Sequence, residues 1–255
     1  MKIIVCIKQV PDTADIKWTE NNTLQREGVE SIINPYDVYA LETALELKQS
    51  LNAEITVLTM GPDQAEDILR KALSIGCDNA ILLSDKKFAG SDTYATGKTL
   101  AAAIKSKLSD FDLIICGQFA IDGDTAQTGP TIANNLGIPQ VTFVKEVVES
   151  NNEYAVVKKE TDEGIEILKV KFPALICMLK GCKEPTRPLI NGKIRAQDAE
   201  IKVYKLNDIG LITPDEAGLK GSPTYVSRAF RPQTKGQCVF VKTAEEICKK
   251  IEEFA

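Results

Sequence analysis

Strand-like and helix-like patterns alternate through the first 137 residues, and this alternation restricts the fold more than any other feature of the chain. Short apolar runs, of the kind that parallel sheets bury on both faces, are separated by segments with apolar residues at helical spacing. The runs cover residues 2–8, 54–60, 80–83 and 111–116. Consecutive strand–helix units predict an α/β fold with an open, mainly parallel, Rossmann-like sheet and helices on both of its faces.

The pattern changes after Pro139. Strand-like runs at 141–148, 154–157, 165–170 and 175–179 are separated by turn residues. Runs of this kind predict added antiparallel strands at one edge of the sheet.

The last part of the chain differs in composition from the rest. Residues 181–236 carry several of the eleven prolines and little periodicity, and such a stretch buries little of its own surface. We therefore divide the chain into an α/β domain at 1–180, whose β-rich edge is 139–180, and an extended partner-binding arm at 181–255.

A short amphipathic helix is predicted at the end of this arm. Thr243 and Glu246 fit a capping box at its start. Its apolar face suits docking to a partner subunit, and packing on its own domain is the alternative. The face is formed by Ala244, Ile247, Ile251 and Phe254.

A glycine-rich turn from Gly117 to Pro130 lies between the fourth strand and a helical stretch at 131–136. Strand-to-helix turns in open α/β sheets lie at the carboxyl ends of the strands, where nucleotides bind. Glycines let backbone amides approach a ligand, and the amides at a helix start attract a phosphate.

Two interpretations of this turn are about equally supported by its spacing. In one, backbone amides and the hydroxyls of Thr125 and Thr128 hold a phosphate. In the other, Asp122 or Asp124 simply caps the helix. The turn matches neither the GxGxxG pattern nor a P-loop, and its aspartates would repel a phosphate unless they face a ribose, a cap or solvent.

Composition and charge exclude several classes of protein. The net charge of -5 and the pI near 5.1 argue against a general nucleic-acid or anionic membrane surface. No apolar run reaches the roughly 18 residues that span a bilayer, and the N-terminus has no signal-peptide pattern. We expect a cytoplasmic protein that neither binds nucleic acid nor inserts into a membrane.

The chain has no histidine and seven cysteines. Without histidine, neither a zinc or iron–sulfur site nor Ser-His-Asp or Cys-His catalysis is expected. The cysteines lie in apolar runs or singly, which is typical of reduced, buried thiols. We predict no metal site and no catalytic side chain, so a cofactor would perform any hard chemical step.

Three ordered motifs give the chain a family resemblance. Asn34 to Asp37 is a strong helix start, with asparagine as N-cap and proline at the first helical position. Together with the glycine-rich turn and the run from Val157 to Ile176, it resembles the beta (small) subunit of electron-transfer flavoproteins. Glu163 departs from the glycine or aspartate usual at its position, which is a surface-turn change. The resemblance covers essentially the whole chain.

The resemblance implies a heterodimer with a larger alpha subunit that carries FAD, and a second adenine nucleotide bound to this chain. Helix capping by Asn34 and core filling by Cys6 and Met60 are the structural alternatives to a binding role. The residues implied around the nucleotide are Cys6, Asn34, Pro35, Tyr36, Asp37, Met60, Gly117, Gln118, Ala120, Asp122, Gly123, Asp124, Thr125, Ala126, Gln127 and Thr128.

The loop 88–96 distinguishes two groups within the family. It resembles the Ala-Gly-Ser-Asp-Thr pattern of electron-bifurcating members, in which FAD occupies the site that holds AMP in ordinary members. Its glycine permits close approach, and its hydroxyls offer neutral hydrogen bonds to a pyrophosphate. The alternative is that Ser91 or Asp92 merely caps the next helix. The residues implied to bind FAD are Gly90, Ser91, Asp92, Thr93 and Thr96.

The function that this resemblance implies is electron bifurcation. NADH would give a hydride to the FAD of this chain. One electron would pass to ferredoxin, and the other would pass through the alpha-subunit FAD to an acyl-CoA or other flavin dehydrogenase. One alternative is a non-bifurcating beta subunit that binds AMP structurally, and another is a stand-alone nucleotide-binding regulatory module.

An apolar pair marks a candidate docking site in the arm. Residues 184–196 resemble the partner-recognition loop of the family, and residues 218–224 also fit its pattern. We expect Leu189 and Ile190 to anchor the dehydrogenase, since an exposed apolar pair in a polar loop suits a hot spot. Coverage of the pair by this chain is the alternative.

Overall fold

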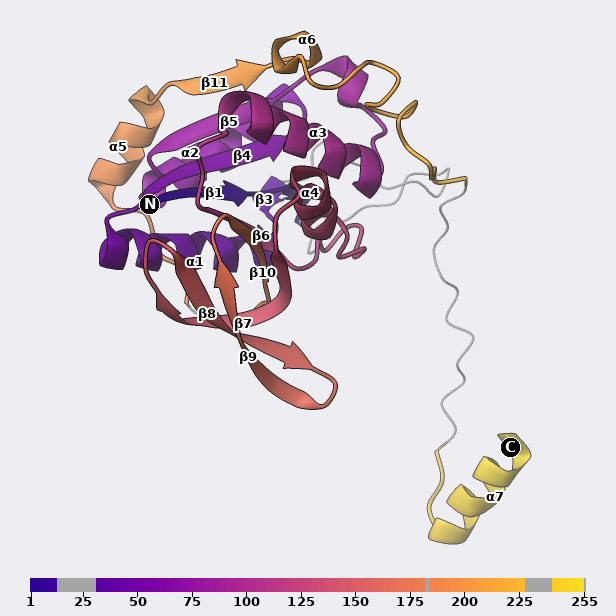
Figure 1. The fold of residues 1–255 in the computed structure, drawn as a ribbon. Coiled ribbons are helices and arrows are strands. Elements are labelled where there is room, and N and C mark those ends of the chain that lie inside the picture. Colours follow the sequence, from indigo (N-terminus) through magenta and orange to yellow (C-terminus); the bar gives the residue numbers. More distant parts are fainter. Residues whose placement is uncertain (13–30, 182–183, 228–239, 255) are drawn as a thin grey trace.

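The sheet in the computed structural model has nine strands in the order β11-β5-β4-β1-β6-β10-β7-β8-β9 (Figure 1). The structure describes residues 1–12, 31–181, 184–227 and 240–254. A separate antiparallel pair joins β2 (Gln9–Pro11) to β3 (Ser31–Ile33). The strands of the main sheet are β1 (Lys2–Cys6), β4 (Glu54–Met60), β5 (Asn79–Leu83), β6 (Leu113–Gly117), β7 (Gln140–Ser150), β8 (Tyr154–Thr161), β9 (Gly164–Lys171), β10 (Ala174–Met178) and β11 (Ile201–Tyr204).

Helices cover both faces of the parallel strands, which confirms the predicted fold class. On one face lie α1 (Pro35–Leu51) and α2 (Glu66–Ile75), and on the other lie α3 (Thr93–Lys107) and α4 (Thr128–Leu136). The remaining helical segments are α5 (Ile190–Asp198), α6 (Leu206–Ile209), α7 (Ala244–Phe254) and the 3-10 turns Asp63–Ala65 and Lys86–Phe88.

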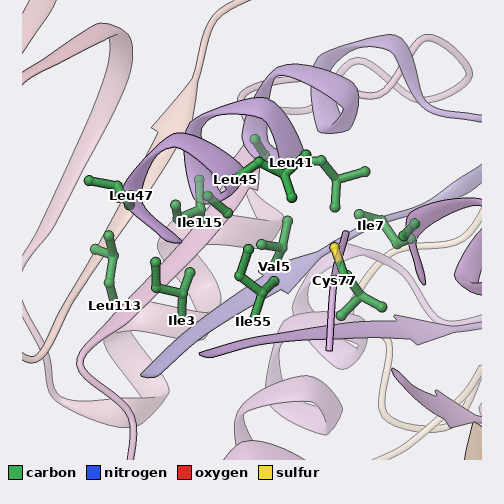
Figure 2. Close-up of a cluster of buried hydrophobic side chains, with 14 of the residues drawn as sticks. Ile3, Val5, Ile7, Leu41, Leu45, Leu47, Ile55, Cys77, Leu113 and Ile115 are labelled. Carbon is green, nitrogen blue, oxygen red and sulfur yellow. The ribbon is translucent and has the colours of Figure 1, made fainter. Parts of the chain in front are cut away.

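The central strand β1 shows why the parallel strands read as continuous apolar runs. Ile3 and Val5 lie on the α1 side, in the cluster that Figure 2 shows with Leu41. Ile4 and Cys6 belong to the second cluster, under α3 and α4. Full burial of an aliphatic side chain stabilises the fold by roughly 1.5–3 kcal/mol. A strand covered on both faces is therefore apolar at most of its positions.

The direction of winding reverses between β1 and β6. From β1 the chain passes through α1 to β4 on one side, whereas from β5 it passes through α3 to β6 on the other. The two connections lie on opposite faces of the sheet. A crevice therefore opens at the carboxyl ends of β1 and β6, the position where ligands bind in doubly wound sheets.

The β-rich edge differs in one strand from the sequence prediction. β7, β8 and β9 are antiparallel, as expected. The run at 175–179 was expected among them, but β10 lies between β6 and β7 and is parallel to both. The reason is visible in its burial, because every residue of β10 is buried, whereas Val141 and Val144 are the two buried residues of β7.

Part of the predicted arm belongs to the sheet. β11 pairs in parallel with β5 and forms the edge of the sheet opposite β9. Arg195 of α5 donates a hydrogen bond to the Leu73 carbonyl of α2, and Ala196 is buried. An extended course is therefore wrong for residues 190–204, because a few well-placed apolar residues suffice to dock a short segment on an existing edge. The partner-binding role of 181–255 stays a prediction.

The helix predicted near the C-terminus is present as α7. The Glu246 amide donates to Thr243 Oγ1 at 3.3 Å, and the Glu246 carboxylate accepts from the Lys242 amide. Ile247 and Ile251 are exposed, so the described part of the chain leaves this face uncovered. Among the described residues, no helix is long and apolar enough to cross a membrane.

Candidate functional site

A cavity of about 890 Å³ lies at the carboxyl ends of β1, β4, β5 and β6. It includes the crevice where the winding reverses. Ligand sites typically measure about 300–1,000 Å³, so this cavity lies near the upper end of that range. Two strand-to-helix connections form much of its wall: residues 117–129 before and into α4, and residues 88–96 before and into α3.

Most of the residues that the sequence singled out line this one cavity. Those that do so are Cys6, Asn34, Asp37, Met60, Gly90, Ser91, Asp92, Thr93, Thr96, Gly117, Gln118, Ala120, Gly123, Thr125, Ala126, Gln127 and Thr128. Pro35, Tyr36, Asp122 and Asp124 do not line it. The aromatic rings of Tyr36 and Phe119 meet edge to face at 5.4 Å, so Tyr36 supports the turn from behind.

Asn34 holds the glycine-rich turn. Its side-chain amide donates to the Phe119 carbonyl at 2.8 Å, and its oxygen accepts from the Ile121 amide at 3.2 Å. It makes no side-chain capping bond to α1. Asn34 therefore occupies the predicted N-cap position of α1, but its side chain holds the turn instead of capping the helix. Asn34 is 1% exposed, so both bonds are made away from water.

Asp37 joins the ends of β1 and β6. Its carboxylate accepts from the Lys8 amide at 2.7 Å and from the Gly117 amide at 3.2 Å. A side chain at Gly117 would overlap Asp37 Oδ1, which explains why glycine stands there. Burial raises the pKa of Asp37 to about 7, because desolvation outweighs the hydrogen bonds from Asn34, Lys8 and Gly117 that favour the ionised form.

The two aspartates of the turn do not cap α4. Asp122 forms an ion pair with Lys8, at 2.6 Å between Nζ and Oδ1, and Asp124 has a left-handed backbone with φ of 48°. The N-cap position of α4 is Gln127, without a side-chain capping bond. Capping by Asp122 or Asp124 is therefore wrong, and the start of α4 has no side-chain cap that would compete with a phosphate.

The second wall of the cavity is the loop before α3. Asp92 is the N-cap of α3, where its Oδ1 accepts from the Ala95 amide at 2.9 Å, so the capping role considered for it is confirmed. Ser91 Oγ donates to the Phe88 carbonyl at 2.8 Å. Desolvation pushes the pKa of Asp92 up, but hydrogen bonds from Ala95 and Thr224 outweigh it and lower the pKa. Asp92 therefore stays ionised at neutral pH.

Sequence reasoning missed several polar residues of the wall. Three of them come shortly after a strand: Lys8 after β1, and Ser84 and Lys86 after β5. Their position in the sequence could therefore have predicted that they line the cavity. Lys205 follows β11 and reaches the cavity only because β11 pairs with β5. The lysines give the wall cationic groups near its carboxylates, a mixture suited to a ligand with phosphates and hydroxyls.

Three thiols lie in register on neighbouring strands. Cys116 of β6 is opposite Cys6 of β1 and Cys177 of β10, and all three belong to the cluster under α3 and α4. Hydrogen bonding to Cys6 and burial raise the pKa of Cys116, and burial raises the pKa of Cys177 to about 12. Cys116 and Cys177 are therefore neutral, and all three thiols are free and buried, as predicted.

The remaining cysteines differ in their surroundings. Cys77 is buried, whereas Cys248 is exposed on α7, contrary to the expectation of buried thiols throughout. Cys182 and Cys238 lie outside the described residues. Among the residues that the structure describes, no group of His, Cys, Asp and Glu has a geometry that would hold a metal ion.

The predicted docking pair is exposed. Leu189 and Ile190 are 78% and 77% exposed at the start of α5, and Ile194, one turn further on, is 55% exposed. Coverage of the pair by the described part of this chain is therefore wrong. Thr186, just before the pair, donates from its amide and its hydroxyl to the buried carboxylate of Glu42, each at 2.7 Å. This contact fixes the base of the loop to α1.

The chain matches a known family over most of its length. A family model described as the electron transfer flavoprotein domain matches residues 21–209. The electron transfer flavoprotein subunit beta of Megasphaera elsdenii is 45% identical over 255 residues, which cover 96% of this chain and 93% of the relative.

Two further relatives carry other names. Protein FixA of Bradyrhizobium diazoefficiens is 45% identical over 253 residues, covering 96% of this chain and 88% of the relative. The caffeyl-CoA reductase-Etf complex subunit CarD of Acetobacterium woodii is 44% identical over 238 residues, covering 92% of this chain and 90% of the relative.

Proposed function

Because the chain belongs to the electron transfer flavoprotein family, as a relative of its beta subunits and of FixA proteins, we propose that its cavity holds FAD. The observation that carries the proposal is the convergence of two helix starts, those of α3 and α4, on one cavity of about 890 Å³. FAD has two phosphates, whereas AMP has one and is much smaller. A cavity near the upper end of the usual range, with two helix starts in its wall, favours the dinucleotide.

The chain's own groups fit such a ligand. The turn at 117–128 offers the amides of a helix start together with Thr125 and Thr128, and its conformation is fixed by Asn34 and Asp37. The loop at 88–96 offers the hydroxyls of Thr93 and Thr96 at the start of α3, where Asp92 already caps the Ala95 amide. Bound FAD would supply hydride acceptance from NADH and one-electron transfer to ferredoxin and to the FAD of the alpha subunit. No acid–base side chain of this chain is required, in line with its lack of histidine.

We propose that the partners are an alpha subunit, ferredoxin and a flavin dehydrogenase. The relative whose name places it in a caffeyl-CoA reductase complex supports a dehydrogenase that acts on acyl-CoA thioesters. Leu189 and Ile190 would anchor that dehydrogenase, because both are exposed and the base of their loop is tied to the buried Glu42.

The first experiment counts nucleotides. The heterodimer with its alpha subunit is purified, its nucleotides are released by denaturation, and FAD and AMP are quantified by chromatography. We expect two FAD per heterodimer, of which NADH reduces one rapidly. One FAD and one AMP would overturn the FAD assignment and leave a single-flavin beta subunit.

The docking role has a separate test. Ile190→Asp should reduce the rate of electron transfer to the dehydrogenase by about tenfold or more while FAD content stays unchanged, because a charge in an apolar anchor prevents its desolvation. Ile167→Asp is the matched control, since Ile167 is 67% exposed on β9 and lies away from the loop. Loss of FAD in the Ile190 variant, or an equal loss of rate in the control, would contradict the docking role.

A further inference from the structure

A segment far away in the sequence is fastened onto the loop before α3. We call residues 217–224 the strap. The Leu219 amide donates to the Ala89 carbonyl at 3.1 Å, and the Asp92 amide donates to Ser222 Oγ at 2.8 Å. The Thr224 amide and hydroxyl donate to Asp92 Oδ2 at 3.0 and 2.7 Å. The strap thus binds one wall of the cavity at three successive points.

The backbones of the strap and the loop are in close contact. Gly218 has a left-handed φ of 61°, and a side chain there would overlap the Lys87 carbonyl oxygen. Leu219 Cβ lies 3.2 Å from the position that a Cβ of Gly90 would occupy. Displacement of the strap would therefore move the loop, or leave its carbonyl and carboxylate groups without these partners.

Asp92 is the group through which the strap acts. Its Oδ1 caps α3 through the Ala95 amide, and its Oδ2 accepts from Thr224. The loop and the first turn of α3 line the cavity, whereas no residue of the strap does. The strap therefore affects a ligand only by fixing the groups that touch it.

We propose that Gly218, Ser222 and Thr224 are positioning residues for the nucleotide, and that the strap sets the affinity for FAD from outside the cavity. The inference rests on the proposed function. It assigns to the strap the task of positioning the loop at 88–96, which would contact one of the two phosphates of a dinucleotide. A ligand with one phosphate can be held at the turn before α4 alone, so AMP depends less on the strap. Strap variants change the ratio of the two affinities, which a general loss of stability does not do.

Two variants of the full chain test the proposal, each with a matched control. Ser222→Ala with Thr224→Val removes two hydroxyls that contact the loop. Its control is Thr213→Val, because the Thr213 hydroxyl also donates to a carboxylate, that of Glu216, but not to the loop. Gly218→Ala pushes the strap away from Lys87. Its control is Gly210→Ala, which has a similar φ of 70° but open space around its Cβ position.

Dissociation constants for FAD and for AMP are measured by equilibrium dialysis. We expect the dissociation constant for FAD to rise about tenfold in both strap variants, the scale of one or two lost hydrogen bonds, and that for AMP to rise less than threefold. The controls should stay within twofold of the wild type. Unchanged FAD affinity in the strap variants, an equal loss for both nucleotides, or an equal loss in the controls would overturn the proposal.

Hydrogen exchange of the nucleotide-free chain separates the two levels of the inference. Faster exchange of the Asp92 and Ala95 amides in the strap variants is expected, whether or not a nucleotide binds. If the wild type bound neither FAD nor AMP, the proposed function would fail. Hydrogen exchange would still measure the effect of the strap on the loop. If exchange at these amides did not change, the positioning role would fail even with FAD binding intact.

Discussion

The two walls of the cavity are held in opposite ways. The turn at 117–128 is fixed from within the sheet by Asn34 and Asp37, which are 1% and 5% exposed. The loop at 88–96 is fixed from outside by the strap, whose Thr224 is exposed. A bond away from water costs more to break than an exposed one, because water partly replaces the exposed bond. The first wall is therefore part of the folded core, and the second is open to adjustment.

The largest expected effect concerns the ionisation of Asp37. Its folded pKa of about 7 exceeds the ordinary value of 3.8, so the folded state holds a proton that the unfolded state releases between about pH 4 and pH 7. The contribution of Asp37 to the free energy of unfolding is therefore greatest below about pH 4. It falls as the pH rises and is lost above about pH 7. A shift of this size corresponds to roughly 4 kcal/mol.

Urea unfolding from pH 4 to 8 checks this prediction against Asp37→Asn, which removes the titration. The unfolding free energy of the wild type minus that of the variant should fall as the pH rises from 4 to 8. Asp112→Asn is the control, because Asp112 also accepts a backbone amide, that of Lys2, at the exposed end of β1. A pH-independent difference for Asp37→Asn would show that the inner wall does not hold an uncharged carboxyl group.

Gly117→Ala tests how tightly the inner wall is packed. The new Cβ would overlap Asp37 Oδ1 and lie 2.8 Å from the Asp37 amide nitrogen. We expect a loss of about 2–3 kcal/mol in unfolding free energy, as for overpacked cores, measured by chemical denaturation. Gly123→Ala is the matched control on the same turn, since nothing lies within 4 Å of its Cβ position. Equal stability of the two variants would refute tight packing at Gly117.

Asn34→Ala removes both hydrogen bonds that hold the turn. The Phe119 carbonyl and the Ile121 amide would lose their Asn34 partner, which should cost about 2 kcal/mol of unfolding free energy. Asn79→Ala, which removes an exposed bond to Glu54, should cost less than about 0.5 kcal/mol. Thermal unfolding compares the two. A similarly small loss for both variants would show that the buried hydrogen bonds of Asn34 stabilise the fold no more than an exposed bond does.

The smallest effect is expected at the outer wall. Lys98 of α3 pairs with Glu216, next to the strap, at 2.8 Å, and both side chains are partly exposed. The hydrogen bond from Lys98, together with those from Thr213, lowers the pKa of Glu216 to about 2. Lys98→Met should raise that pKa toward its ordinary value while the midpoint of thermal unfolding at pH 7 stays nearly unchanged. An NMR titration of the Glu216 carboxyl and a thermal melt measure the two. A large fall in the melting midpoint would contradict the contrast between the walls.

The central sheet and much of the cavity wall could be predicted from the sequence, because short local patterns indicate them. Continuous apolar runs specify strands buried on both faces, and the glycine-rich turn follows one of them. Parallel strands place their carboxyl ends at one edge, so residues as distant as Cys6, Met60 and Gly117 converge without any knowledge of their contacts.

Other features were not predictable because they depend on which segments meet. The apolar run of β10 is compatible with an interior strand or an edge strand. Its pairing with both β6 and β7 makes it an interior strand. Asn34 has the composition of a helix cap, but its side chain instead bonds a turn that lies 85 residues further along the chain. Lys205 reaches the cavity only through the pairing of β11 with β5.

The sequence by itself determined the fold class, the family and the edge of the sheet at which a ligand would bind. It did so because hydrophobic periodicity and turn chemistry act over a few residues and are legible in one chain. The tertiary structure alone decided how each wall of the cavity is held. The bonds of Asn34, Asp37 and Thr224 join residues that are distant in sequence, and no local pattern records such a contact.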